Sequence, residues 1–164
     1  MAEVLDELLQ SAEDTQRGRF LTFSVGKEDY GIEISFVTEI IGIQEITEIP
    51  ELPDYVKGII NLRGKIIPVM DVRLRFKKAQ IDYDNRTCII VIDIREVSVG
   101  LIVDKVCEVL SISEENTVPP PDIKTGFLNR YIKGIGKVGN EVKLLLDCDK
   151  LLNDDELSHL NEAM

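Results

Sequence analysis

The chain has 164 residues, 44% of them hydrophobic and 30% charged, and a chain of this length buries about 70% of its unfolded surface in one domain or two packed halves. Its formal net charge of −11 disfavours general attraction to nucleic acid or anionic lipid. No apolar run approaches the ~20 residues of a membrane span, and the N-terminus is acidic where a signal peptide is basic, so we expect a cytoplasmic protein without direct membrane insertion.

The sequence predicts an N-terminal arm or short helix over residues 1–19, in which one helical face would carry the apolar residues Val4, Leu5, Leu8 and Leu9. From residue 20 the apolar residues recur with a period of two, which predicts short β-strands separated by turn residues. The elements predicted before the first prolines are a strand at 20–25, a hairpin turn at 26–29, a strand at 30–34, a helical turn at 35–39 and strands at 40–43 and 46–49.

A second hairpin is predicted between residues 55 and 71, where two β-branched runs flank the turn sequence Asn61-Leu62-Arg63-Gly64. Arg63 stands at the tip of this hairpin. Asp71 is the predicted N-cap of a short helix through Phe76, and the polar residues 77–87 connect this half of the chain to the next.

The order of elements then repeats. Residues 20–31 reappear in pattern 69 positions later, and residues 55–59 reappear 76 positions later as Tyr131-Ile132-Lys133-Gly134-Ile135. The repeat divides the chain into a first β-barrel half with its connector (20–87), a second β-barrel half (88–152) and a C-terminal helix or tail (153–164).

Each half has about five short strands, and so small a unit hides its strand edges best by curling into a barrel. We therefore predict a mainly all-β fold of two packed five-stranded barrels that arose by internal duplication, with short helices at the termini. A groove between two such barrels is a common place to bind a partner.

Residues that carry chemistry are scarce. Three cysteines, Cys88, Cys107 and Cys148, lie far apart without a neighbouring histidine, which favours free thiols over a metal site. The sole histidine, His159, lies in the polar C-terminal tail, so a rigid site lacks a general base. We expect no catalytic residues, no metal and no cofactor, and therefore no enzyme.

The repeat also separates residues that serve the shared fold from residues that need another explanation. Lys57-Gly58 recurs as Lys133-Gly134, and Glu39 recurs as Glu108, so the fold alone accounts for these. Arg63 instead corresponds to Gly139, and Asn61 corresponds to Lys137. The second copy thus makes the same turn without an arginine.

Basic residues surround this turn. Residues 57–78 hold seven basic side chains against one acidic one, whereas the matched stretch 133–154 holds four of each. This segregation suits docking of an acidic partner surface, with arginine as a bidentate anchor. Two alternatives remain: the basic side chains neutralise acidic residues of their own fold, or they form the nucleic-acid face of a double barrel, although Phe76 is the single aromatic residue among them.

These residues resemble a known family. The stretch Val56-Lys57-Gly58-Ile59-Ile60-Asn61-Leu62-Arg63-Gly64-Lys65-Ile66-Ile67-Pro68-Val69-Met70-Asp71-Val72-Arg73 looks like the signature of the bacterial chemotaxis coupling family CheW, and Val99-Gly100-Leu101-Ile102-Val103-Asp104-Lys105-Val106 resembles its second-half signature. The likeness covers residues 19–152. The same domain occurs in the histidine kinase CheA and in CheV-type proteins, but without a kinase, phosphotransfer or receiver segment here a free-standing coupler is expected.

The resemblance implies two SH3-like barrels and a scaffold without catalysis. It implies an adaptor that couples the cytoplasmic tip of methyl-accepting chemoreceptors to the regulatory domain of CheA, in the cytoplasm and recruited to membrane receptor arrays. A coupler of a non-flagellar pathway, such as surface motility, is the alternative within this class. The helical receptor tip would lie in the apolar groove between the barrels. By match to the family motifs, the partner-binding residues are Val37, Glu39, Asn61, Arg63, Gly64, Gly100 and Val109.

Overall fold

The computed structural model describes residues 18–120 and 130–151, which form short strands with few helical turns. The predicted N-terminal arm and C-terminal helix therefore lie outside the described residues, apart from Gly18 and Arg19. In chain order the elements are β1 (Arg19–Val25), β2 (Glu28–Glu33), the 3-10 turn η2 (Ile34–Phe36), β3 (Val37–Gly42), β4 (Val56–Leu62), β5 (Lys65–Asp71), α2 (Val72–Arg75), β6 (Cys88–Ile94), β7 (Val97–Val103), β8 (Lys105–Ser111), the 3-10 turn η3 (Glu114–Asn116), β9 (Thr117–Val118), β10 (Ile132–Val138), β11 (Glu141–Leu146) and α4 (Cys148–Leu151).

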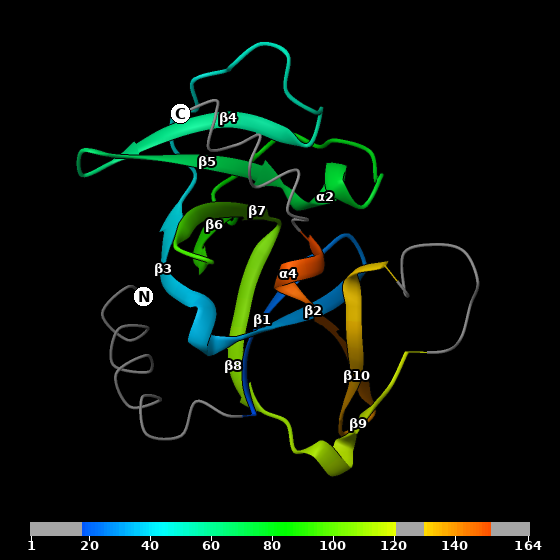
Figure 1. Ribbon diagram of the computed structural model, residues 1–164. Coiled ribbons are helices and arrows are strands. Elements are labelled where there is room, and N and C mark those ends of the chain that lie inside the picture. Colours follow the sequence, from blue (N-terminus) through cyan, green and yellow to red (C-terminus); the bar gives the residue numbers. More distant parts are fainter. Residues whose placement is uncertain (1–17, 121–129, 152–164) are drawn as a thin grey trace.

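The strands form two sheets (Figure 1). Sheet A has the order β8-β1-β2-β11-β10-β9, and sheet B has the order β3-β6-β7-β5-β4. The mainly β composition is as predicted. In each sheet the first and last strands are not hydrogen-bonded to each other, so neither sheet is a closed barrel. Sheet A also has a sixth strand, the two-residue β9, in addition to the five predicted.

The two halves of the sequence exchange their first hairpins, which corrects the prediction that residues 20–87 and 88–152 each form one barrel. The hairpin β1–β2 lies in sheet A among strands of the second half, and its repeat β6–β7 lies in sheet B among strands of the first half. Two equivalent parallel contacts join them, Leu145 beside Gly31 and Val69 beside Gly100. Because both hairpins carry the same apolar pattern, the sequence pattern alone does not determine which half receives which hairpin.

Two local predictions also needed correction. Residues 46–49 do not form a strand, since their described pairing is a single bridge between Thr47 and Ile59. The helical turn is η2, and β3 already begins at Val37. Asp71, in contrast, caps α2 as predicted, because its Oδ1 accepts a hydrogen bond from the Arg73 amide at 2.9 Å.

The largest hydrophobic cluster lies between the two sheets. It takes alternate residues from the exchanged hairpins, including Leu21 and Phe23 from β1 and Ile90 and Ile92 from β6, all fully buried. The side chains on the opposite faces of these strands line the interior of each sheet. A strand whose two faces are both buried is strongly held in register, because a slip of one residue would exchange the faces.

Candidate functional site

The hairpin between β4 and β5 ends in a two-residue turn formed by Arg63 and Gly64. Both residues have positive φ, 53° and 87°, which is the geometry of the two-residue turns that match the twist of paired strands. Asn61 belongs to β4, not to the turn as predicted, and its Oδ1 accepts a hydrogen bond from the Gly64 amide at 2.8 Å. Asn61 therefore supports the turn from the strand, and Arg63 is the residue displayed.

Positive φ is unfavourable for a residue with a Cβ atom, so an arginine is a poor choice for the turn itself. The repeat makes the equivalent turn between β10 and β11 with Gly139 and Asn140, and Gly139 has a φ of 62°. Arg63 is thus present in spite of the backbone geometry. A reason for its presence lies in its side chain.

Arg63 forms a bidentate ion pair with Glu39. Arg63 Nη1 donates to Glu39 Oε1 at 3.2 Å, and Nη2 donates to Oε2. Glu39 lies in β3 and Arg63 follows β4, and these strands are the two opposite edges of sheet B, so the curl of the sheet brings its edges together here. The hydrogen bond with Glu39 and its negative charge raise the pKa of the Arg63 guanidinium.

The ion pair distinguishes two glutamates that the repeat makes equivalent. Glu108 occupies in β8 the place that Glu39 occupies in β3, but the matching turn offers Gly139, which has no side chain to pair with it. The side chain of Arg63 is 71% exposed and that of Glu39 is 26% exposed. Of these two equivalent turns, that of sheet B therefore presents a guanidinium to solvent with its orientation set by a carboxylate.

Two of the predicted binding residues are buried. Val37 is 7% exposed and belongs to the cluster between the sheets. Gly100 lies in the central strand β7, and a Cβ atom added to it would stand 2.7 Å from Ile89 Cγ2 and 2.8 Å from Val69 Cγ1. Gly100 is therefore required by the close approach of its neighbours, and both residues support the fold beneath the surface.

Val109 is half-buried in β8, the edge strand of sheet A, beside Leu21 of β1. It packs against the cluster between the sheets, as do Val106 of β8 and Phe36 and Ile40 near the start of β3. The half-buried residues of β3 and β8 thus contribute apolar side chains at the margin of the same cluster.

Three of the seven basic residues around the turn are paired with carboxylates of the fold itself, which agrees in part with one of the alternatives left open by the sequence. Arg73 Nε and Nη2 donate to the two Asp104 carboxylate oxygens, both at 2.9 Å. Lys78 donates to Glu28 at 3.1 Å. Lys57 and Lys65 instead donate to the neutral side chains of Gln80, at 3.3 Å, and Ser98, at 2.7 Å.

Arg75 was not singled out from the sequence, yet it is buried at 7% exposure. Its guanidinium carbon lies 4.4 Å from the ring centre of Tyr55 and 4.9 Å from that of Tyr131, which are equivalent residues of the repeat. Its Nε donates to the Leu151 carbonyl at 3.0 Å. An arginine after an N-capped turn gave no local signal of burial, because both aromatic partners are distant in sequence.

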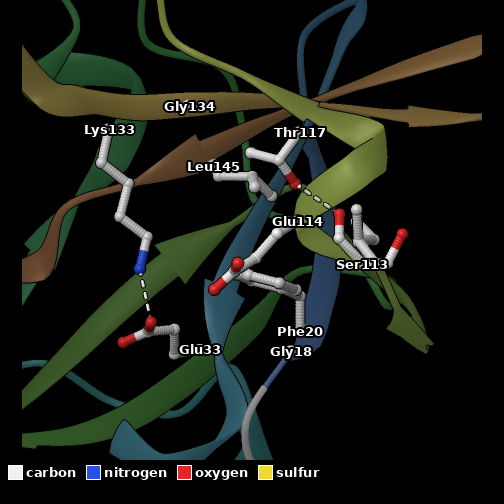
Figure 2. A pocket seen from close by; sticks show the side chains of 10 residues that line it. Gly18, Phe20, Glu33, Ser113, Glu114, Thr117, Lys133, Gly134 and Leu145 are labelled. Atoms are coloured by element: carbon white, nitrogen blue, oxygen red, sulfur yellow. Dashed lines mark hydrogen bonds and ion pairs between the residues drawn. The ribbon is translucent and has the colours of Figure 1, made fainter.

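A pocket of about 700 Å³ opens on sheet A (Figure 2). The apolar residues Phe20, Ile112 and Leu145 line it, and Lys133 Nζ pairs with Glu33 at 2.6 Å on one side. None of the seven predicted binding residues lines this pocket. It lies within one sheet, so it is not the groove predicted between the two barrels.

Residues 18–120 and 130–151 hold no group of three histidine, cysteine, aspartate or glutamate side chains arranged to bind a metal ion. All three cysteines are free, and burial raises the pKa of the Cys148 thiol to about 12. No helix in this part of the chain has the length and apolar character needed to cross a membrane.

Comparison with known proteins identifies the family that has this architecture. The family model of the CheW-like domain matches residues 19–156. The chain is 38% identical over 147 residues to the chemotaxis protein CheW of Klebsiella aerogenes, covering 90% of this chain and 89% of that protein, and 33% identical over 153 residues to CheW of Treponema pallidum, covering 91% and 90%. The crystal structure of the scaffolding protein TtCheW from Thermoanaerobacter tengcongensis superposes with a TM-score of 0.78 at 36% identity, over 85% of this chain and 94% of that one.

The chain belongs to the CheW-like domain family.

The family assignment confirms the resemblance read from the Asn-Leu-Arg-Gly hairpin and confirms an SH3-like double-barrel architecture, with the open sheets and exchanged hairpins described above. As a CheW-like protein it is a coupling adaptor of bacterial chemotaxis signal transduction. Neither a nucleic-acid-binding role nor a different chemosensory pathway is favoured by these relatives.

Proposed function

We propose that this protein is a non-enzymatic adaptor in the cytoplasm, recruited to membrane receptor arrays, where it couples the cytoplasmic tip of chemoreceptors to the regulatory domain of the histidine kinase CheA. The observation that carries the proposal is the Arg63–Glu39 pair. It displays an arginine in a turn that disfavours one, at a position that the second copy leaves to glycine. An exposed, oriented guanidinium suits bidentate recognition of a partner carboxylate.

The receptor surface in this proposal consists of the Arg63–Glu39 pair together with half-buried apolar residues of β3 and β8. Ile40, Val106 and Val109 all pack at the margin of the cluster between the sheets. An amphipathic receptor helix would place its apolar side chains against this margin and its acidic side chains toward Arg63. Val37 and Gly100 contribute by holding β3 and β7 in place.

The kinase surface in this proposal lies at the strand ends next to the two equivalent hairpin turns. Ile66 follows the Arg63–Gly64 turn and is 38% exposed, and Val142 follows the Gly139–Asn140 turn and is 53% exposed. These two residues occupy equivalent positions of the repeat, and both are large apolar side chains facing solvent. Exposed apolar residues at matched places suit docking of a partner domain of similar shape.

The test is reconstitution of chemoreceptor-bearing membranes with CheA and this protein, with autophosphorylation of CheA as the readout. Arg63→Asp should abolish receptor-dependent activation and weaken co-sedimentation with the membranes by about thirtyfold, the usual effect of losing an interface hot spot. The circular dichroism spectrum should not change, because Arg63 lies on the surface.

A matched control is Arg86→Asp, since the side chain of Arg86 is 72% exposed and that of Arg63 is 71% exposed. Arg86 lies in the connector before β6 and should tolerate charge reversal with full activation. Activation that survives Arg63→Asp would contradict the role given to Arg63. Co-sedimentation of the wild-type protein with receptor membranes in the absence of CheA tests the receptor partner separately from the kinase.

A further inference from the structure

The chain passes from one sheet to the other at two equivalent places. Strand β2 of sheet A leads into β3 of sheet B through the turn Ile34–Phe36, and β7 of sheet B leads into β8 of sheet A through Asp104. Asp104 lies 69 positions after Ser35, the middle residue of the first crossover, which is the spacing of the repeat. An aspartate therefore stands in one crossover where the other has a serine.

The side chain of Asp104 bridges the two sheets. Its Oδ1 accepts a hydrogen bond from Arg73 Nε and its Oδ2 accepts one from Arg73 Nη2, both at 2.9 Å, and Arg73 belongs to α2, which follows β5 of sheet B. Oδ2 also accepts from the amide of Gly26 at 2.8 Å, in the turn between β1 and β2 of sheet A. The Asp104 amide donates to the Ser24 carbonyl at 3.1 Å. The crossover is thus fastened to both sheets.

This Asp104 bridge, formed with Arg73 and Gly26, is partly shielded from water. The side chain of Arg73 is 16% exposed and that of Asp104 is 24% exposed. Burial alone would raise the pKa of the Asp104 carboxyl, but the hydrogen bonds from Arg73 and Gly26 hold this pKa below its ordinary value. A bidentate arginine–carboxylate contact with little exposure has a better defined geometry than an ion pair at the surface.

The other crossover has a weaker arrangement. The counterpart of Arg73 is Asp149 in α4, and the counterpart of Gly26 is Arg95 in the turn between β6 and β7. Arg95 Nε lies 3.5 Å from Asp149 Oδ1, and the two side chains are 52% and 51% exposed. This ion pair joins the turn to α4 directly. The serine at the crossover, Ser35, carries no charge that could bridge them.

Strand β8 meets sheet B again just after Asp104. The amide of Val106 donates a hydrogen bond to the thiol of Cys88, the first residue of β6, and Cys88 pairs with Gly42 at the end of β3. The start of β8 is therefore held against sheet B at two nearby points, Asp104 and Val106. Its course along the margin that it shares with β3 depends on both.

We propose that Asp104 is a positioning residue for the receptor surface, because its bridge from α2 to the β1–β2 turn fixes the place of β8 relative to β3. This step rests on the proposed function, in which Val106 and Val109 of β8 and Ile40 of β3 belong to the receptor surface. Asp104 acts through the course of β8. Loss of the bridge should change the angle between the sheets and weaken receptor binding while Arg63 and its turn stay as they are.

The angle between the sheets is measured in the isolated chain by residual dipolar couplings of the backbone amides of β10 and β11 and of β5 to β7. Asp104→Asn keeps the shape of the side chain but removes its charge and one acceptor oxygen. It should change this angle and raise hydrogen exchange of the Gly26 amide about tenfold or more, the usual effect of losing a hydrogen bond to a charged group. An unchanged angle with unchanged exchange at Gly26 would overturn the proposal.

Two further variants isolate the bridge. Arg73→Gln removes it from the other side and should change the angle in the same way, and the double variant with Asp104→Asn should add nothing, because both substitutions act on one contact. Asp149→Asn is the matched control at the counterpart of Arg73. It breaks the ion pair with Arg95 and should leave both the angle and the exchange of Gly26 as in the wild type.

Co-sedimentation with receptor-bearing membranes, without CheA, measures the consequence for binding. Asp104→Asn should weaken it about tenfold, a typical size for an effect transmitted from outside a binding surface, whereas Asp149→Asn should bind as the wild type does. Asp104→Asn that changes the angle but binds normally would refute the positioning role. Wild-type protein that does not co-sediment would instead refute the proposed function, and the dipolar couplings would still decide whether the bridge sets the angle.

Discussion

Glu39 and Arg63 join the two edge strands of sheet B at their exposed ends. Glu39 lies in β3, Arg63 follows β4, and the order of the sheet places these strands farthest apart in the hydrogen-bonded ladder. Strand pairing does not connect β3 to β4. The ion pair connects these two edges instead, and it holds the exposed guanidinium of Arg63 beside the partly buried carboxylate of Glu39.

The first prediction separates the ion pair from the displayed charge. The exchange Glu39→Arg with Arg63→Glu keeps an opposite-charge pair across the same edges, so the thermal midpoint of unfolding should stay close to that of the wild type. The arginine then stands on β3, and receptor-dependent activation of CheA should be lost. Differential scanning calorimetry and the reconstituted kinase assay measure the two effects. Full activation by the exchanged pair would show that only the ion pair matters.

The second prediction concerns the close approach at Gly100. Gly100→Ala forces a Cβ atom to within 2.7 Å of Ile89 and 2.8 Å of Val69, so the free energy of unfolding should fall by about 1–3 kcal/mol, the typical cost of overpacking. Gly31 is the matched control, because an added Cβ would lie 3.1 Å from the Leu145 Cδ2 atom. Urea denaturation should rank Gly100→Ala as the more destabilising change. Equal stability of Gly100→Ala and the wild type would refute the packing role.

The third prediction concerns Arg75. Arg75→Ala removes a buried guanidinium from between Tyr55 and Tyr131 and a hydrogen bond to the Leu151 carbonyl, so we expect a loss of about 2 kcal/mol or more in the free energy of unfolding. Chemical denaturation measures this loss. Arg86→Ala, at an exposed arginine, should change the free energy of unfolding little. A similar effect of the two substitutions would argue against a structural role for Arg75.

The fourth prediction is the pH dependence that Asp29 confers. Ser24 donates to Asp29 Oδ1 at 2.7 Å and Lys143 donates to Oδ2 at 2.9 Å, and these hydrogen bonds hold the pKa of Asp29 below its ordinary value. A carboxyl group whose pKa is lower in the folded protein stabilises it above the unfolded pKa of about 4 and loses that contribution as the pH falls through the folded pKa.

Asp29→Asn should therefore lower the free energy of unfolding at neutral pH and reduce its fall between about pH 4.5 and pH 2. Denaturation curves recorded across this range measure both effects. Asp54→Asn, at an exposed aspartate, serves as the control and should retain the acid dependence of the wild type. An unchanged acid dependence in Asp29→Asn would contradict the contribution assigned to this carboxylate.

Sequence reasoning succeeded where the signal was local. The alternation of apolar residues predicted most strands, and Asp71 capped α2 as expected. The stretch 46–49 had the same alternation but formed only one bridge, to Ile59 in the edge strand β4, because Pro50 and Pro53 follow it and interrupt the pairing. Among the site residues, Arg63 was found by its difference from Gly139, whereas the burial of Val37 and Gly100 depended on distant strands.

The sequence by itself determined the repeat, the strand periods, the hairpin that carries Arg63 and the family signature, since all of these are patterns among near neighbours in the chain. Only the tertiary structure decided that the β1–β2 and β6–β7 hairpins change places, that Glu39 and not Glu108 meets an arginine, and that Arg73 and Lys78 are neutralised by Asp104 and Glu28. The physical reason is that the two hairpins have the same alternation of apolar residues, so this alternation alone does not determine which sheet each hairpin joins. Which long-range strand contacts form, and which charges then meet, follows from packing in three dimensions.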